Sequence, residues 1–346
     1  MSIRVLAVLL LAIVSACGPQ TAKGTPTSSP ARSASPTATT SATAAPQSLS
    51  CKLPVVTDKD AGWLSFPAAA YQPDPRSNVT LPVVGNSPLS KSYDRLFERW
   101  LAVARDWISP DGRHYTYSDP LYPSSYEQGH VPPSRVHVVD IASGADHSFD
   151  PGPTPADSSW SVLDYENEGV YLAMLGYGPS VPTGLWLLNP SSGALRKLSD
   201  TFVAQYISGR GAWGTSDALA GHGPGLGSRL LRLDLASGAV ESWYKRTDME
   251  FSVLGADGAG HPVLNVWKGQ TAQVLLVTAR DIVSVLQPAQ GDGVPALASG
   301  AHPVSDEHGM WFSDQHGNIW LYSPSTGIKR MAEVSSGDLA IGGGCH

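Results

Sequence analysis

One stretch near the C-terminus holds five side chains of the types that bind metal ions: His302, Asp306, Glu307, His308 and His316. Imidazole nitrogens and carboxylate oxygens are common ligands of Zn²⁺ in proteins. However, residues 306–309 match the hairpin turns formed by residues 111–112 and 166–169 in other copies of a repeat described below. We therefore interpret this group as a structural turn, and we expect neither a metal site nor another cofactor.

Catalytic motifs are equally weak. The chain has no G-x-S-x-G motif, which would place a serine nucleophile on a sharp turn between a strand and a helix. The stretch SDQHGNIW (313–320) resembles the Asp-box of sialidases, but Gln315 stands where that box has its aspartate. We predict no catalytic residue from these patterns.

The three cysteines indicate different chemistry. The N-terminal stretch MSIRVLAVLLLAIVSAC has one basic residue, Arg4, followed by an apolar run and then small residues, which is the layout of a secretory signal. Residues 14–17, Val-Ser-Ala-Cys, resemble the bacterial lipobox, and this resemblance implies that Cys17 becomes the lipid-modified N-terminus. The alternative is an ordinary signal peptide cut after Ala16, which would leave Cys17 as a free thiol.

Residues 18–50 are expected to form a tether. Of these 33 residues, 26 are Pro, Ser, Thr or Ala, a composition that cannot bury enough apolar surface to fold. Removing residues 1–17 would change the formal charge from −7 to −8, because one arginine and no acid are lost. Such a chain lacks the basic face of a nucleic-acid binder. We expect a monomer in the bacterial cell envelope, anchored to the membrane through Cys17 on its extracytoplasmic side.

Cys51 and Cys345 remain if Cys17 is lipidated. They begin and end the expected folded domain, residues 51–346, and thiols of exported proteins tend to oxidise. We predict that these two cysteines form a disulfide that joins the ends of the domain.

A repeated hairpin determines the expected fold. Its copies have an apolar strand, a turn containing Ser or Thr before Gly, and a second strand, and they lie at residues 135–149, 184–198, 229–243 and 318–332. The turn glycines are spaced by 49, 45 and 89 residues, and the last spacing is two periods. A degenerate copy, QVLLVTARDIVSVLQ (273–287), lies halfway, with Arg280-Asp281 in place of Ser-Gly.

Both faces of the first strand of this hairpin are apolar. One face carries Val136, Leu185, Leu230, Val274 and Ile319, and the next position carries His137, Trp186, Leu231, Leu275 and Trp320. A strand that is apolar on both sides must be covered on both sides, as in the stacked blades of a propeller.

A second hairpin precedes each of these, with a glycine turn and often an aromatic residue two positions later. Two hairpins per period give four-stranded blades, and five such blades fit within residues 104–334. Residues 51–103 and 335–346 would together form a sixth blade, in which the last strand takes the innermost place and closes the ring. We predict an all-β, six-bladed β-propeller, with seven blades as the alternative because residues 51–103 are long and irregular.

The hairpin WISPDGRHYTY (107–117) resembles the repeats of TolB-like and WD-like propellers. The stretch HGMWFSDQHGNIWLYSPSTG (308–327) resembles a repeat of NHL and streptogramin lyase propellers. These resemblances imply a fold but little about activity, because propellers have many unrelated functions. The repeated tryptophans are expected to pack between blades.

The loops between the second and third strands of the blades are long and differ from one another, whereas the hairpin turns are short. Because length that a fold does not require often carries function, we predict a ligand face there. Its candidate residues are Tyr122, Tyr126, Glu127, His130, Tyr177, His222, Trp267, Lys268 and His316. The alternative is that these loops merely vary.

Three functions remain open. The first is a non-catalytic module that binds a protein, a glycan or a small molecule on the long-loop face. The second is a lyase or hydrolase that acts on a small metabolite or glycan, and the third is a structural spacer. At least two ionisable residues within hydrogen-bond distance at the mouth of the central channel would favour an enzyme, whereas a sparsely polar mouth would favour binding.

Overall fold

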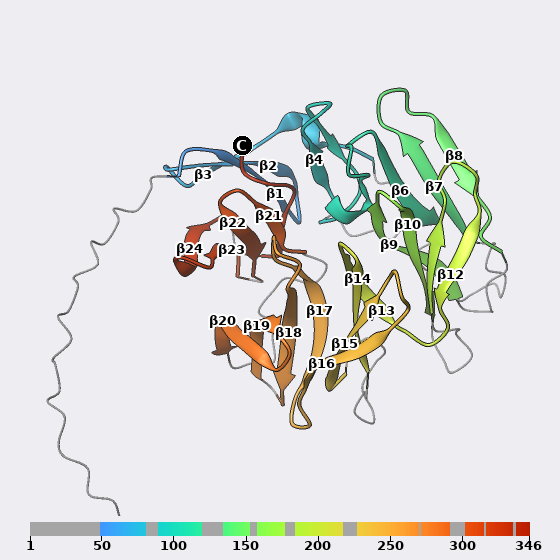
Figure 1. The fold of residues 1–346 in the computed structure, drawn as a ribbon. Coiled ribbons are helices and arrows are strands. Elements are labelled where there is room, and N and C mark those ends of the chain that lie inside the picture. Colours follow the sequence, from blue (N-terminus) through green and yellow to red (C-terminus); the bar gives the residue numbers. More distant parts are fainter. Residues whose placement is uncertain are drawn as a thin grey trace, which may run out of the picture. The chain divides into compact units, whose positions relative to one another are not determined.

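Antiparallel sheets account for nearly all regular structure in the computed structural model of the chain, which describes residues 49–80, 89–119, 134–152, 158–176, 184–216, 227–269, 271–290, 302–314, 316–334 and 337–346. Residues 48–346 form one unit. The sheets follow one another around a centre, as Figure 1 shows, and the strand nearest the centre contacts that of the next blade in several places. This is the predicted six-bladed β-propeller.

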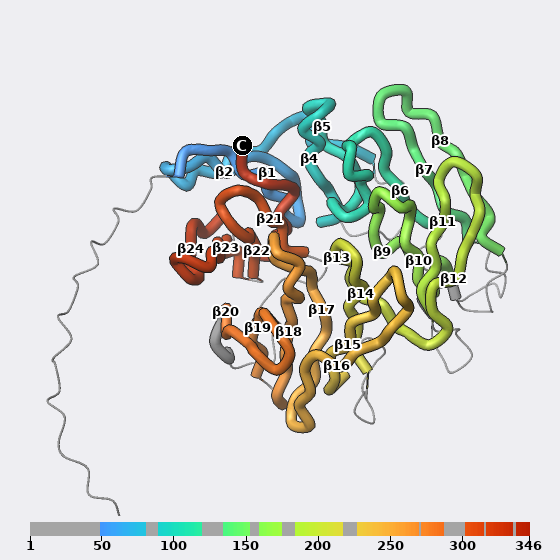
Figure 2. The backbone as a smooth tube through the Cα atoms, viewed as in Figure 1, coloured from blue at the N-terminus to red at the C-terminus, as the bar shows by residue number. Residues whose placement is uncertain are grey.

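The closing blade joins the two ends of the domain. Its strands are β1 (Lys52–Thr57), β2 (Ala61–Ser65), β3 (Ala70–Pro73) and β25 (Leu339–Ile341), in the order β25-β1-β2-β3. Strand β25 therefore takes the edge that the first strand takes in the other blades, as the sequence predicted. In the tube of Figure 2 the red C-terminal segment runs beside blue β1, which shows the ring closed by both ends of the domain.

Five further blades follow in chain order. The second blade contains the short 3-10 helix η2 (Arg105–Trp107), then β6 (His114–Asp119), β7 (Arg135–Asp140) and β8 (Asp146–Phe149). The third contains β9 (Ser158–Glu166), β10 (Gly169–Gly176), β11 (Leu185–Leu188) and β12 (Leu195–Ser199). The fourth contains β13 (Ala204–Ser208), β14 (Gly211–Ser216), β15 (Arg229–Asp234) and β16 (Val240–Lys245). The fifth contains β17 (Glu250–Ala256), β18 (Pro262–Lys268), β19 (Thr271–Ala279) and β20 (Ile282–Gln290). The sixth contains β21 (Val304–Asp306), β22 (Gly309–Ser313), β23 (Asn318–Ser323) and β24 (Gly327–Glu333).

The second blade lacks a regular innermost strand. In its place a single bridge pairs Ile108 with Tyr115 of β6, so this sheet has three strands. The residues before that bridge form η2 instead of a strand, and η2 contacts β9 of the third blade. The chain therefore reaches the centre of the ring here as a turn of helix.

The irregular segment before the second blade forms a small extra hairpin. Its strands are β4 (Ser92–Asp94) and β5 (Arg99–Leu101), and the short 3-10 helix η1 (Pro75–Ser77) precedes it. Tyr93 and Trp100 pack with residues of the closing blade, whereas Leu101 and Val103 pack with residues of the second blade. This two-stranded sheet is thus a wedge between two blades, which explains why the length of residues 51–103 raised the alternative of seven blades.

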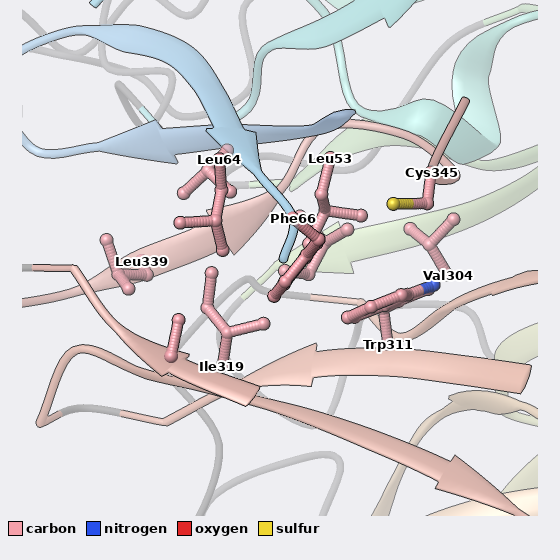
Figure 3. Close-up of a cluster of buried hydrophobic side chains, with 11 residues drawn as sticks. Leu53, Leu64, Phe66, Val304, Trp311, Ile319, Leu339 and Cys345 are labelled. Atoms are coloured by element: carbon pink, nitrogen blue, oxygen red, sulfur yellow. The ribbon is translucent and has the colours of Figure 1, made fainter. Parts of the chain in front are cut away.

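The repeat explains how the blades pack. The five residues predicted at one position of the third strands are fully buried, each with 0% of its surface exposed: Val136, Leu185, Leu230, Val274 and Ile319. Trp186, Trp213 and Trp311 are also buried, which confirms their packing role. Figure 3 shows one such core, in which Phe66 of the closing blade lies beside Trp311 of the sixth.

The hairpin turns contain a side-chain cap in addition to glycine. Gly144, Gly193, Gly238 and Gly327 have φ values of 69–73°, where a Cβ is unfavourable. A side chain four positions earlier accepts hydrogen bonds inside the same turn, as in the 2.6 Å bond from the Ser143 hydroxyl to Asp140. In the degenerate copy, Asp281 takes the turn position that requires a positive φ, with a φ of 57°. Aspartate tolerates this conformation better than most residues, so the turn survives without glycine.

The predicted disulfide between Cys51 and Cys345 is present, and it links residues 294 positions apart. Backbone hydrogen bonds between Lys52 and His346, of 2.7 and 3.1 Å, lie next to it. The three glycines before Cys345 pass close to other groups. A Cβ on Gly342, Gly343 or Gly344 would lie 3.0–3.1 Å from its nearest neighbour, so the closure leaves little room for side chains.

Candidate functional site

A cavity of about 400 Å³ opens where the short hairpin turns gather. Its walls are the turn between β4 and β5, the turn before β6, the turn between β21 and β22, and the C-terminal glycines. The lining residues are Pro54, Tyr93, Asp94, Arg95, Leu96, Arg105, Pro110, Asp111, Gly112, Val304, Ser305, Asp306, Glu307, Gly343 and Gly344. These turns lie at the opposite strand ends from the long loops. The cavity is thus on the face where the sequence analysis did not expect a ligand.

Carboxylates of the cavity are held in place by local hydrogen bonds. Asp94 is 3% exposed, and its Oδ1 accepts a 2.8 Å bond from the N–H of Phe97. The Ser109 hydroxyl donates to Asp111 Oδ1 at 2.6 Å, and this bond holds the pKa of Asp111 below its ordinary value. Each turn therefore presents an oriented carboxylate to the cavity, with its second oxygen left for other contacts.

Asp306 differs from its neighbours because both of its oxygens are used within the fold. Its Oδ2 accepts hydrogen bonds from Trp311 Nε1 and from the N–H of Cys345, both of 2.7 Å. Its Oδ1 accepts from the N–H of His308 at 2.8 Å. Asp306 thus ties the sixth blade to the C-terminal segment, and the turn that the sequence analysis assigned to residues 306–309 is confirmed.

A smaller void adjoins the cavity. Arg105 and Val304 line both the cavity and this void of about 20 Å³, which is also lined by Lys91 and His302. Arg105 belongs to η2, and His302 precedes β21. Arg105 of η2 thus lies between the cavity and the smaller void.

Four blades contribute polar side chains to this central channel. His302 Nδ1 lies 2.8 Å from Asp106 Oδ2, and the ring of Tyr206 lies 6.2 Å from the His302 ring, measured between centroids. Asp164, on β9, is 7% exposed and accepts a 2.8 Å bond from the N–H of Tyr165. The side chain of His302 is 41% exposed, and His302 lines the small void described above.

The channel shifts the proton affinity of these groups. Burial raises the pKa of Asp164 well above its ordinary value, and the nearby carboxylates of Asp106 and Glu166 raise it further. Burial lowers the pKa of His302, but the ion pair with Asp106 outweighs this effect, so the net shift is upward. Burial, followed by the same carboxylates, raises the pKa of the Tyr206 hydroxyl. All three shifts favour the protonated form of the group concerned, the carboxylic acid of Asp164, the imidazolium of His302 and the phenol of Tyr206.

This arrangement can bind polar groups and exchange protons with them. Asp106 and His302 are two ionisable side chains within hydrogen-bond distance of each other, as acid–base chemistry requires, but they lie inside the ring and not at the channel mouth named in the criterion above. Within the part of the chain that the structure describes, no three side chains of His, Cys, Asp or Glu are placed to hold a metal ion.

Comparisons with known proteins return propellers. No family model matches the chain, and no curated protein matches it. Among solved structures, TolB from Acinetobacter baumannii is 14% identical with a TM-score of 0.45, over 84% of this chain and 65% of TolB. The tricorn protease is 12% identical with a TM-score of 0.45, over 82% of this chain and 26% of the protease. Virginiamycin B lyase from Staphylococcus aureus is 11% identical with a TM-score of 0.39, over 81% of this chain and 84% of the lyase.

These structures are distant neighbours. This chain spans less than two thirds of the length of TolB and about a quarter of the tricorn protease. At such low identities the likeness concerns the β-propeller fold alone.

Most residues of the predicted ligand face lie outside the described residues, namely Tyr122, Tyr126, Glu127, His130, Tyr177 and His222. Cys17 and the tether up to residue 48 also lie outside them. The structure therefore leaves the predictions for these residues as they were. Among the described residues, no helix has the length and apolar character needed to span a bilayer.

Three predicted residues are described, and each has a local role. Lys268 forms a 2.8 Å ion pair with Asp248, and this bond, followed by one from Arg246, lowers the pKa of Asp248 to about 2. Trp267 is half-buried at the end of β18. His316 is exposed, and its N–H donates to Asp314 at 2.9 Å. No contact in the described part of the chain joins these three side chains into a site.

Sequence reasoning named His302 only as a side chain of a metal-binding type and missed the other channel residues, although the repeat carried a signal for two of them. Asp164 pairs with Tyr171 and Tyr206 pairs with Trp213, each five residues before the turn glycine of its hairpin. Val304 holds the same position in the sixth blade. Polar residues at a position that faces the axis were thus detectable in the alignment of the hairpins. Asp106 and His302 had no such signal because they lie outside regular strands.

Proposed function

We propose that this protein is an extracytoplasmic binding protein, in which the propeller takes a small polar ligand at the turn-face mouth of its central channel. The cavity of about 400 Å³ carries this proposal, because it presents charged groups of both signs and adjoins a second void lined by Lys91 and His302. Ligand sites of proteins are commonly concave and of 300–1,000 Å³.

The same proposal includes a lipid anchor at Cys17 and a tether of residues 18–50. It is supported by the resemblance of residues 14–17 to a lipobox and by the composition of the tether. Metabolic labelling with a fatty acid tests it. The full chain should incorporate the label and sediment with membranes, whereas the Cys17→Ala variant should do neither. Membrane association of the unlabelled variant would contradict the anchor.

A screen of thermal unfolding tests the binding site. The unfolding temperature of the full chain with Cys17→Ser, a substitution that removes the site of the lipid, is measured with and without amino acids, short peptides, amines and sugars. Ser305 lines the cavity and is exposed, so Ser305→Trp should fill the cavity without disturbing the core. A ligand should raise the unfolding temperature of the parent chain and of the control Ser325→Trp, but not that of Ser305→Trp. A stabilising ligand that is insensitive to Ser305→Trp would place binding elsewhere.

A second candidate is acid–base catalysis on the bound ligand, as in a lyase or hydrolase. It is favoured by the 2.8 Å contact of His302 with Asp106 and by the raised pKa of Asp164 in the same channel. If the channel catalyses a reaction, His302→Gln should abolish turnover of a ligand found in the screen and leave its binding measurable. If the parent chain returns the ligand unchanged across pH 5–9, the catalytic candidate fails and the binding proposal stands.

A further inference from the structure

The cavity at the turn face brings together charges of opposite sign that do not pair with each other. Arg95 lies in the turn between β4 and β5, and Arg105 lies in η2. Both side chains are exposed, and among the described residues neither has a hydrogen bond or an ion pair. A guanidinium is suited to bidentate binding of a carboxylate, so both groups are available to an anionic ligand atom.

Three carboxylates of the same cavity retain acceptor capacity. Asp94 uses Oδ1 for the N–H of Phe97, and its Oδ2 faces the opposite turn, where a Cβ on Gly112 would lie 3.5 Å away. Asp111 likewise uses only Oδ1 in its local hydrogen bonds. Glu307 is exposed and has no partner among the described residues. A ligand ammonium group with three N–H donors could therefore be bound by this side of the cavity.

We infer that the cavity binds a zwitterion, a molecule with an ammonium group and a carboxylate joined by a short chain, such as an amino acid or a short peptide. The inference rests on the proposed binding function and goes beyond it by naming the ligand class. An organic cation alone would leave the two guanidinium groups without partners. An anion alone would be repelled by the carboxylates, which outnumber the arginines that line the cavity.

The shape of the cavity agrees with a ligand of this size. Its volume of about 400 Å³ exceeds that of one amino acid and leaves room for a short peptide. Glu307 comes from the sixth blade, whereas both arginines come from other elements, Arg95 from the β4-β5 hairpin and Arg105 from η2; Asp94 and Asp111 lie near those arginines in the chain. The two ends of one ligand can thus be held at separate points, which makes the distance between its charges a determinant of affinity.

Titration calorimetry with a graded set of probes tests the inference. The full chain with Cys17→Ser is titrated with glycine, glycylglycine and triglycine, and with their C-terminal amides and N-acetylated forms. At least one unmodified probe should bind, and blocking either end should weaken binding about tenfold or more, because each block removes a charge-assisted contact. Arg105→Gln should weaken the free acid by a similar factor and leave the amide unaffected. Arg210→Gln, in the turn between β13 and β14 of the fourth blade and outside the lining of the cavity, is the control and should change nothing.

Other results would overturn the inference, in two distinguishable ways. If blocked probes bind as tightly as free ones, or if only a sugar or a simple amine binds and Ser305→Trp abolishes that binding, the ligand class is wrong while the proposed function stands. If no probe and no compound of the screen binds, both proposals fail. A retained zwitterion affinity in Arg105→Gln would also exclude the guanidinium contact. If Arg105→Gln loses affinity as expected, Arg105→Lys shows whether a positive charge alone is sufficient or the guanidinium geometry is required.

Discussion

The disulfide that closes the ring offers the most direct test of how this fold is stabilised. In the double variant Cys51→Ala/Cys345→Ala, the unfolded chain gains the freedom that the cross-link removed. The link spans 294 residues, for which the chain-entropy relation gives about 5 to 6 kcal/mol at 25 °C as an upper figure. Three residue pairs between β1 and β25 remain, together with the backbone bonds of Lys52 and His346. We therefore expect the variant to fold and to lose about 3 to 6 kcal/mol of unfolding free energy.

Urea unfolding of the full chain with Cys17→Ser, with and without the double substitution, measures this loss. The slope of unfolding free energy against urea should increase in the variant, because an unfolded chain without the cross-link exposes more surface. The parent chain unfolded in the presence of a reductant should match the variant, since both lack the bond. Without reductant, the denatured parent should contain no free thiol.

A loss below about 1 kcal/mol, with an unchanged slope, would refute this reasoning. It would mean that the segments of β1 and β25 and the cluster around Trp311 keep the two ends of the domain in contact even in the unfolded state. Detection of two free thiols in the denatured, unreduced parent would instead show that the bond does not form.

Three further predictions concern the channel, the turns and the closure. The stabilisation that His302 receives from Asp106 is present below pH 6.5 and is lost as the pH rises through the raised folded-state pKa of His302. The urea midpoint of the parent should therefore fall more between pH 5 and 9 than that of His302→Gln. An equal change of the midpoint with pH in both proteins would contradict the ion pair. Gly193→Ala should lower the free energy of unfolding by about 2 kcal/mol or more, and Gly238→Ala by about 1 kcal/mol, in thermal or urea unfolding. Both glycines have positive φ, but only a Cβ at position 193 would meet an aromatic ring, that of Phe149, 2.7 Å away. Asp306→Ala should cost about 2 to 4 kcal/mol, since the indole N–H of Trp311 and one backbone N–H lose their acceptor; a loss below 1 kcal/mol would show that water replaces the carboxylate.

The fold could be predicted because the information for it is local and repeated. A turn glycine every 45 to 49 residues and strands that are apolar on both faces leave few architectures other than stacked blades. The closing blade and its disulfide followed from simple counting, since a leftover segment with strand character and one leftover cysteine lay at each end of the domain. The β4-β5 wedge was not predicted, because three-residue strands carry too little pattern to be recognised.

The candidate site was only partly within reach of the sequence. Loop length indicated a ligand face on the long loops, and most of the candidate residues of that face lie outside the described part of the chain. The cavity instead opens among the short turns, where charged residues are common because they cap the turns. Asp111 is an example, because it caps its own turn and also lines the cavity.

The sequence by itself determined the blades, their turns and the covalent closure, because strand periodicity and the conformational demands of a turn are properties of a few neighbouring residues. Only the tertiary structure decided which polar groups meet at the axis. Asp106, Asp164 and His302 are up to 196 positions apart, and they converge only because the closed ring brings the inner segments of separate blades into one narrow channel. Burial then raises the pKa of Asp164 and the contact with Asp106 raises that of His302, and no local pattern of residues contains that information.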